Sequence, residues 1–220
     1  MVNYSMIRLN LAILFLITIS TFAESSILCI GDSITEGGKS FKVYRFPLND
    51  LLKKAGFKYR FVGSKENAEE GVSLKHDGYG GKNTQFLKEN IEKIYKANPA
   101  DFVLLHAGHN NFARDKPVAR IISDTKEIIK EIQKINPRAV ILLAQVIPSG
   151  KLPKYSYIPE LNRQLSRLSI EPYIMTVNIA KGFDWQTDTV ADKVHPNKKG
   201  AEKMAAAWFE ALSAFPEKFE

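Results

Sequence analysis

Five short apolar runs, separated by segments with helical spacing, follow one another along most of this chain of 220 residues. The runs are rich in branched side chains, and the later three do not alternate apolar with polar positions. The runs are residues 27–30, 59–63, 101–107, 139–146 and 173–178. Short, continuously apolar runs are typical of strands buried on both faces of a parallel sheet. The sequence therefore predicts a three-layer α/β/α sandwich around a five-stranded parallel sheet with right-handed crossovers.

The segments between these runs each place their apolar residues on one stripe, which is the pattern of an amphipathic helix. The predicted helices are residues 48–55, 86–95, 121–135, 158–168 and a last helix from about 196 to 212. Pro99 and Pro137 are expected to end the two middle helices before the next strand. Residues 64–83 show neither periodicity, so we expect a long polar loop there and treat it as a candidate binding element.

The N-terminal segment differs from the rest of the chain. Arg8 precedes an uncharged run of 15 residues, 9–23, whereas about 20 residues are needed to span a bilayer. Thr21 and Ala23 form a small-residue cleavage site. We therefore expect residues 1–23 to be a signal peptide and residues 24–220 to be one secreted or periplasmic domain, with no stable membrane insertion after cleavage. An uncleaved N-terminal anchor is the alternative.

Charge and cysteine content exclude several classes of protein. The 31 Lys and Arg residues exceed the 24 Asp and Glu residues, for a net charge of +7. The basic residues are scattered, so no nucleic-acid partner is expected. Cys29, the only cysteine, lies in the first apolar run and is expected to pack as a small hydrophobe. The chain contains no zinc-protease motif, cysteine cluster or phosphate-binding loop, so we expect no metal and no organic cofactor.

Ser33 lies immediately after the first predicted strand, in the stretch "ILCIGDSITEGG". Functional groups gather at the carboxyl ends of strands in such sheets, but a serine hydroxyl needs a base to become a nucleophile. His195 is the strongest candidate, because Asp192 precedes it by three residues in a loop before the last helix. One turn of chain brings the carboxylate to one imidazole nitrogen and leaves the other for Ser33. Alternatively, Asp192 only caps a turn and His195 only precedes a helix.

The three other histidines are weaker candidates for the base. His106 lies within the third apolar run and is expected to be a hydrogen-bonded core residue. His76 lies in the predicted loop 64–83, where it either lines a cleft or is solvated. His109 follows Gly108 near the predicted site, and the sequence leaves its role open.

Acyl transfer also needs donors for the oxyanion, and each donor is typically worth ~3 kcal/mol of barrier. The glycines of "GYGGKN" (78–83) let backbone N–H groups approach a ligand closely. Asn110 follows the third strand, and the N–H of Ser33 itself is a further donor. A flexible turn at the glycines and an Asx turn at Asn110 are the structural alternatives.

Three sequence blocks, taken in order, resemble those of the SGNH (GDSL-type) hydrolase superfamily. They are "GDSIT", a Gly-x-Asn in "GHNN" after the central strand, and "DKVHP" before the last helix. The resemblance implies an SGNH/flavodoxin-like fold for residues 24–220. It also implies that Ser33, His195 and Asp192 form a catalytic triad, with Ser33, Gly81 and Asn110 as the oxyanion hole.

A narrower resemblance links "VYRFPLNDLLKKAGFKYRFVGS" and "HDGYGGK" to carbohydrate acetylesterases of the acetylxylan esterase type. The chain departs from their usual pattern at His109, where Thr is common, at Asn111, where Asp is common, and at Lys82, where an aromatic residue is common. We assign Asp32, His109 and Lys82 to substrate binding.

Together with the predicted signal peptide, the resemblance implies an exported serine esterase. Its substrate would be a carbohydrate, or another small ester, that carries an acetyl or other short acyl group. One alternative is a lipid-directed acylhydrolase such as a lysophospholipase or thioesterase, which the polar segment 64–83 disfavours. The other alternative is a carbohydrate-binding module without catalytic activity.

Overall fold

The structure, a computed structural model, describes residues 24–168 and 173–219. The predicted signal peptide, residues 1–23, lies outside the described residues. The strands are β1 (Ser25–Gly31), β2 (Tyr59–Val62), β3 (Lys65–Glu69), β4 (Val72–Gly78), β5 (Phe102–His106), β6 (Val140–Ala144) and β7 (Ile174–Val177). The α-helices are α1 (Ser33–Glu36), α2 (Arg45–Lys54), α3 (Thr84–Ala97), α4 (Val118–Ile135), α5 (Ile158–Leu165), α6 (Trp185–Asp188) and α7 (Lys198–Leu212). Two short 3-10 helices span Ala113–Asp115 and Pro216–Lys218.

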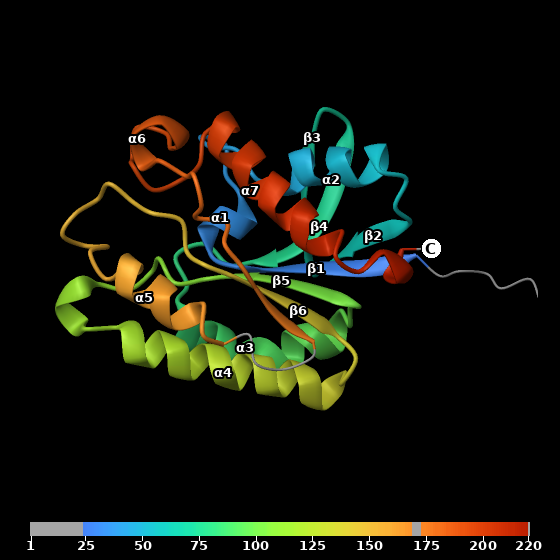
Figure 1. The fold of residues 1–220 in the computed structure, drawn as a ribbon, viewed down its shortest axis with the longest axis horizontal. Coiled ribbons are helices and arrows are strands. Elements are labelled where there is room, and N and C mark those ends of the chain that lie inside the picture. The colour runs from blue at the N-terminus through green and yellow to red at the C-terminus, as the bar shows by residue number, and fades with distance from the viewer. Residues whose placement is uncertain (1–23, 169–172, 220) are drawn as a thin grey trace, which may run out of the picture.

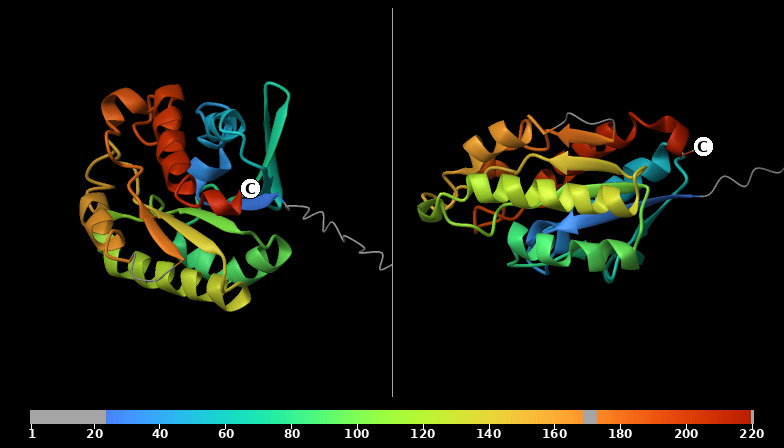
Figure 2. Two further views of the ribbon diagram at one scale, coloured as in Figure 1. Left: turned by 45° about the vertical axis from the view of Figure 1, so that its right-hand side comes forward. Right: turned by 90° about the horizontal axis from the view of Figure 1, so that it is seen from below.

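These elements form three layers, as the alternation of strands and helices predicts. The strand order is β3-β4-β1-β5-β6-β7, with β2 also paired to β1. All pairings are parallel except that of β3 with β4. Helices α3, α4 and α5 cover one face of the sheet, and α2 and α7 cover the other (Figure 1; Figure 2). The predicted α/β sandwich is therefore confirmed.

The central strands contribute side chains to two separate hydrophobic cores, because successive side chains of a strand point to opposite faces of the sheet. In β1, Leu28 and Ile30 pack under α3 and α4, whereas Ile27 and Cys29 pack under α2 and α7. This double burial explains why the runs read as continuously apolar. Cys29 is fully buried, and burial raises the pKa of its thiol to about 11.

The expectation of a long loop at residues 64–83 is wrong, because most of that segment forms the antiparallel hairpin of β3 and β4. The sheet consequently has seven strands instead of five. Exposed and half-buried positions alternate along β3. Because neither face of β3 is fully buried, its sequence is polar and lacks the apolar pattern of a strand. The first part of β1 pairs with β2, and its last two residues pair with the end of β4. His76 lies in β4 and is buried, so it neither lines a cleft nor meets solvent.

Within residues 24–168 and 173–219, every helix is too short or too polar to cross a lipid bilayer.

Asp188, at the end of α6, ties together the segment that carries the predicted base. Its side chain is fully buried, and it accepts hydrogen bonds from the backbone N–H of Asp184 (2.7 Å) and from Lys203 Nζ (2.6 Å). Its carbonyl oxygen accepts a hydrogen bond from the N–H of Asn197 (2.9 Å), just before α7. Burial alone raises the pKa of Asp188, but the bonds from Lys203, Asp184 and Thr187 outweigh it and lower the pKa to about 2. The connection from α6 to α7 is thus closed around one carboxylate.

We expect Asp188 to make folding stability sensitive to acid. Its pKa of about 2 in the folded chain lies below the ~3.9 of an unfolded Asp. Its stabilisation is therefore complete above pH ~4 and is lost as the pH falls from there toward ~2. The Asp188→Asn variant should lose ~1–3 kcal/mol of unfolding free energy at neutral pH and show a shallower acid dependence. Urea unfolding of both proteins between pH 2 and 7 measures this, and an equally steep acid dependence in the variant would contradict it.

Candidate active site

The end of β1 delivers Ser33 directly to the carboxyl edge of the sheet. β1 stops at Gly31, and Asp32 caps α1 by accepting a hydrogen bond from the N–H of Ile34 (3.0 Å). A Cβ at Gly31 would lie 2.2 Å from the carbonyl oxygen of His106, so only glycine permits this close approach to β5. Ser33 is the first residue of α1, and its side chain is partly exposed. The Ser33 hydroxyl is therefore presented by the junction of β1 and α1, without an intervening loop.

Ser33, His195 and Asp192 converge at this edge, as the sequence predicts. Ser33 Oγ lies 2.8 Å from His195 Nε2, and His195 Nδ1 lies 2.5 Å from Asp192 Oδ2. The other carboxylate oxygen, Oδ1, accepts hydrogen bonds from the N–H groups of Val194 (2.8 Å) and His195 (3.0 Å). Partial burial opposes ionisation of Asp192, but these bonds outweigh it and lower the pKa of the carboxyl group. Asp192 thus caps the turn through Oδ1 and contacts the imidazole through Oδ2. The capping interpretation and the triad interpretation of this motif are therefore compatible.

Phe41 is a member of the site that the sequence analysis missed. Its ring stacks on the imidazole of His195, with centroids 4.2 Å apart and planes 22° apart. The neighbouring N–H of Lys42 donates to the carbonyl oxygen of Pro196 (3.1 Å), which holds the two segments together. Phe41 lies outside every helix and strand, in a stretch without periodicity, so no local signal marks it. The stack contacts the face of the imidazole, whereas Ser33 and Asp192 contact the nitrogens at its edge.

The glycine loop after β4 lies beside Ser33. A Cβ built on Gly80 would lie 3.9 Å from the Cβ of Ser33, and the Gly80 N–H donates to Glu36 Oε2 (2.7 Å). The adjacent Gly81 is exposed and has a φ of 74°, a conformation that favours glycine. Asn110 Nδ2 donates to the carbonyl oxygen of Lys82 (2.9 Å), which brings the Asn110 loop against this one. One amide hydrogen of Asn110 is used in that bond, and a second is left to donate.

The assignment of Asp32 and His109 to substrate binding is wrong, because both side chains are buried beneath the site. Asp32 is fully buried as the cap of α1, and His109 is 1% exposed. The His109 ring faces inward, with Nε2 3.0 Å from the carbonyl oxygen of Ile147 and Nδ1 3.9 Å from Asp32 Oδ2. Burial lowers the pKa of His109, although Asp32 opposes this. Lys82, in contrast, is exposed at the edge of the glycine loop.

His106 is buried in β5, as expected. The expectation that its ring is hydrogen-bonded is wrong. Neither ring nitrogen has a hydrogen-bond partner among the described residues. Burial lowers the pKa of His106 to about 4, so the imidazole is neutral at physiological pH. Among residues 24–168 and 173–219, no three side chains of His, Cys, Asp or Glu are grouped so that they could hold a metal ion.

Comparisons with known proteins agree with this architecture. The sequence profile described as the GDSL-like Lipase/Acylhydrolase family matches residues 29–203. A family 3 carbohydrate esterase from Clostridium thermocellum has 24% identity and a TM-score of 0.74, over 88% of this chain and 99% of that one. A family 3 carbohydrate esterase from Talaromyces cellulolyticus has 20% identity and a TM-score of 0.77, over 89% and 100% of the two chains.

A third similar structure is a mutant acetyl esterase solved with an acetate ion. It has 20% identity and a TM-score of 0.76, over 89% of this chain and 100% of that one. No curated protein is significantly similar in sequence.

Gly78 is predicted to be essential for the position of α1, which carries Ser33. A Cβ at Gly78 would lie 2.2 Å from the backbone N of Glu36, and this atom cannot move without α1. Gly78→Ala should therefore cost ~1–3 kcal/mol of unfolding free energy and slow the labelling of Ser33 by a fluorophosphonate.

Gly71→Ala is the matched control, because Gly71 has a φ of 80° but no atom within 4 Å of a built Cβ. It should cost ~1 kcal/mol for backbone strain alone and leave the labelling rate unchanged. Equal labelling of the Gly78→Ala variant and the wild-type chain would refute the close-approach argument.

Proposed function

This chain belongs to the GDSL-like lipase/acylhydrolase family, and from that premise we propose that it is a serine esterase that removes acetyl or other short acyl groups from carbohydrate. The observation that carries the proposal is the continuous hydrogen-bonded chain from Ser33 Oγ through His195 to Asp192. Enzymes of this family hydrolyse carboxylic esters, and such a chain is what converts a serine hydroxyl into a nucleophile. The proposal includes export of residues 24–220 after cleavage of residues 1–23.

In the proposed mechanism, Ser33 Oγ attacks the ester carbonyl while His195 Nε2 accepts the hydroxyl proton. Asp192 keeps the proton of the ring on Nδ1 and stabilises the imidazolium that forms. The N–H groups of Ser33 and Gly81 and the free amide hydrogen of Asn110 stabilise the oxyanion. The imidazolium returns its proton to the leaving alcohol, which leaves an acyl group on Ser33. Water then attacks the acyl-enzyme with His195 as base, and the carboxylic acid is released.

Two observations support a carbohydrate carrying a short acyl group. Similar structures are described as carbohydrate esterases of family 3 and as an acetyl esterase. The triad also lies at the surface, with the side chains of His195 and Asp192 23% and 42% exposed. A cavity of about 620 Å³ lies elsewhere, between α4 and α5, and neither Ser33 nor His195 lines it. An open site is suited to an ester that projects from a polymer.

We expect Ser33→Ala to lower kcat for p-nitrophenyl acetate by at least ~10³-fold, because it removes the proposed nucleophile. The unfolding free energy should change by less than ~0.5 kcal/mol, since the side chain is partly exposed. Ser123→Ala, at an exposed serine of α4, is the matched control and should retain full activity. Unchanged turnover in a folded Ser33→Ala variant would reject Ser33 as the nucleophile.

The class of substrate can be tested with acyl-length and carbohydrate series. We expect kcat/KM to fall from p-nitrophenyl acetate to the butyrate and octanoate esters, and acetate to be released from acetylated xylo-oligosaccharides. A steep rise with acyl length would instead show a lipid-directed acylhydrolase. If the folded protein binds oligosaccharides but hydrolyses none of these esters, it is a binding module.

A further inference from the structure

Three lysines border the proposed catalytic centre, each in a different loop at the carboxyl edge of the sheet. Lys82 adjoins Gly81 in the loop after β4, and its carbonyl oxygen holds the Asn110 side chain. Lys193 adjoins Asp192 in the loop before α7. Lys154, in the loop after β6, accepts a backbone hydrogen bond from the N–H of Ala113 (2.9 Å), in the segment that follows Asn110. We call Lys82, Lys154 and Lys193 the lysine rim.

Each ammonium group of the lysine rim lies over an aromatic ring. Lys82 Nζ lies 5.1 Å from the centre of the Phe86 ring. Lys154 Nζ lies 4.7 Å from the ring centre of Phe112 and 4.7 Å from that of Tyr155. Lys193 Nζ lies 5.7 Å from the centre of the Trp185 ring. Such contacts hold a cation in place but do not neutralise it.

Several lysines elsewhere in the structure instead pair with carboxylates. Lys65 Nζ lies 2.7 Å from Glu36 Oε1, and Lys88 Nζ lies 2.7 Å from Asp124 Oδ1. Within residues 24–168 and 173–219, no carboxylate lies within ion-pair distance of any lysine of the rim. The rim is therefore a set of positioned and uncompensated positive charges.

Three carboxylates near this edge have partners outside the lysine rim. Asp192 is bonded to His195, and Glu36 accepts bonds from Lys65 and the Gly80 N–H. Asp115, beyond the Asn110 loop, lies 3.7 Å from the guanidinium of Arg114. None of these three carboxylates pairs with the lysine rim.

The backbone at Lys193 adds an independent observation. Its φ is 62°, in the left-handed region that residues with a Cβ rarely adopt. The conformation is held because the Lys193 carbonyl oxygen accepts bonds from the Gly150 N–H (2.9 Å) and from Ser149 Oγ (2.8 Å). Strained positions of this kind gather at ligand-binding sites. Lys193 directly follows Asp192 in the chain, and its ammonium group lies over the Trp185 ring.

We propose that the substrate is an acidic carbohydrate, an oligosaccharide with uronic acid units, whose carboxylates bind the lysine rim while Ser33 attacks a neighbouring acyl ester. This inference rests on the proposed function. Three cations in three separate loops suit a chain that carries several spaced charges better than a single charged headgroup.

The wild-type chain is tested on a matched pair of substrates, an acetylated oligogalacturonide and the same oligosaccharide with its carboxyl groups reduced to alcohols. Acetate release should give a kcat/KM at least tenfold higher for the acidic member, and the ratio should fall toward one as salt is raised from 20 to 500 mM. A ratio near one at low salt would overturn the inference. Hydrolysis of p-nitrophenyl acetate in the same preparation tests the proposed function separately.

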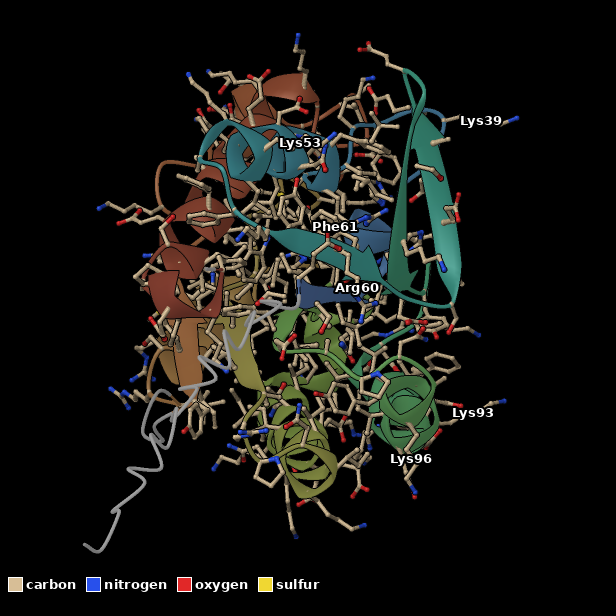
Figure 3. The ribbon with its side chains drawn as sticks, turned by 90° about the vertical axis from the view of Figure 1, so that its right-hand side faces the viewer. Lys39, Lys53, Arg60, Phe61, Lys93 and Lys96 are labelled. Carbon is tan, nitrogen blue, oxygen red and sulfur yellow. The ribbon has the colours of Figure 1, made fainter. Side chains whose placement is uncertain are left out.

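Variants locate the preference in the rim. Each of Lys82→Gln, Lys154→Gln and Lys193→Gln should lower the acidic-to-neutral ratio roughly three- to fivefold, the size expected for one exposed ion pair. Lys154→Arg keeps the charge and should restore the ratio, which a purely structural role would not require. Lys93→Gln is the control and should change nothing, because this exposed lysine points into solvent from the outer face of α3 (Figure 3).

A preference that survives the triple Gln variant, with its fold verified by circular dichroism, would overturn the inference. So would rim-dependent binding to phosphatidylserine vesicles combined with equal cleavage of both oligosaccharides, because the rim would then serve a lipid surface.

Discussion

The hydrogen bond between Ser33 Oγ and His195 Nε2 joins residues that are 162 positions apart in the chain. The rest of the structure serves to bring these two atoms together. β1, buried between two cores, sets the position of Ser33, and the closed connection around Asp188 sets that of His195. Because the strands next to β1 are parallel, the loops that follow them meet at one edge of the sheet (Figure 1). The site is therefore a product of the topology.

Close backbone contact around α1 is the second constraint. Glycines at the ends of β1 and β4, Gly31 and Gly78, allow the short helix to sit directly against its neighbours. The carboxylate of Glu36, at the end of α1, then accepts bonds from the glycine loop and from Lys65 of the hairpin. One short helix thus connects the proposed nucleophile, the glycine loop proposed to supply an oxyanion donor and the β3–β4 hairpin. Oxyanion stabilisation requires donors that are held in place before the substrate binds, and these contacts are of that kind.

Polar side chains at the site divide into a buried set and an exposed set with different roles. Asp32, at the start of α1, and His109, in the loop after β5, are buried beneath the site, and their burial keeps them from the substrate. The lysine rim lies above, where aromatic rings hold the cations and leave their charge unpaired. In the proposed function, the reaction depends on the triad and its oxyanion donors, whereas the choice of substrate depends on the lysine rim. Such a division lets one fold carry the same chemistry to different esters.

The sequence alone determined the alternation of strands and helices, the placement of Ser33 after a buried strand and the pairing of Asp192 with His195. Each of these is local, because apolar periodicity reports the burial of its own segment and a three-residue spacing spans one turn. Only the tertiary structure decided that residues 65–78 form a hairpin, that Asp32 and His109 point inward and that Phe41 stacks on His195. Strand pairing and side-chain direction depend on neighbours that are distant in sequence. No local pattern of polar residues contains that information.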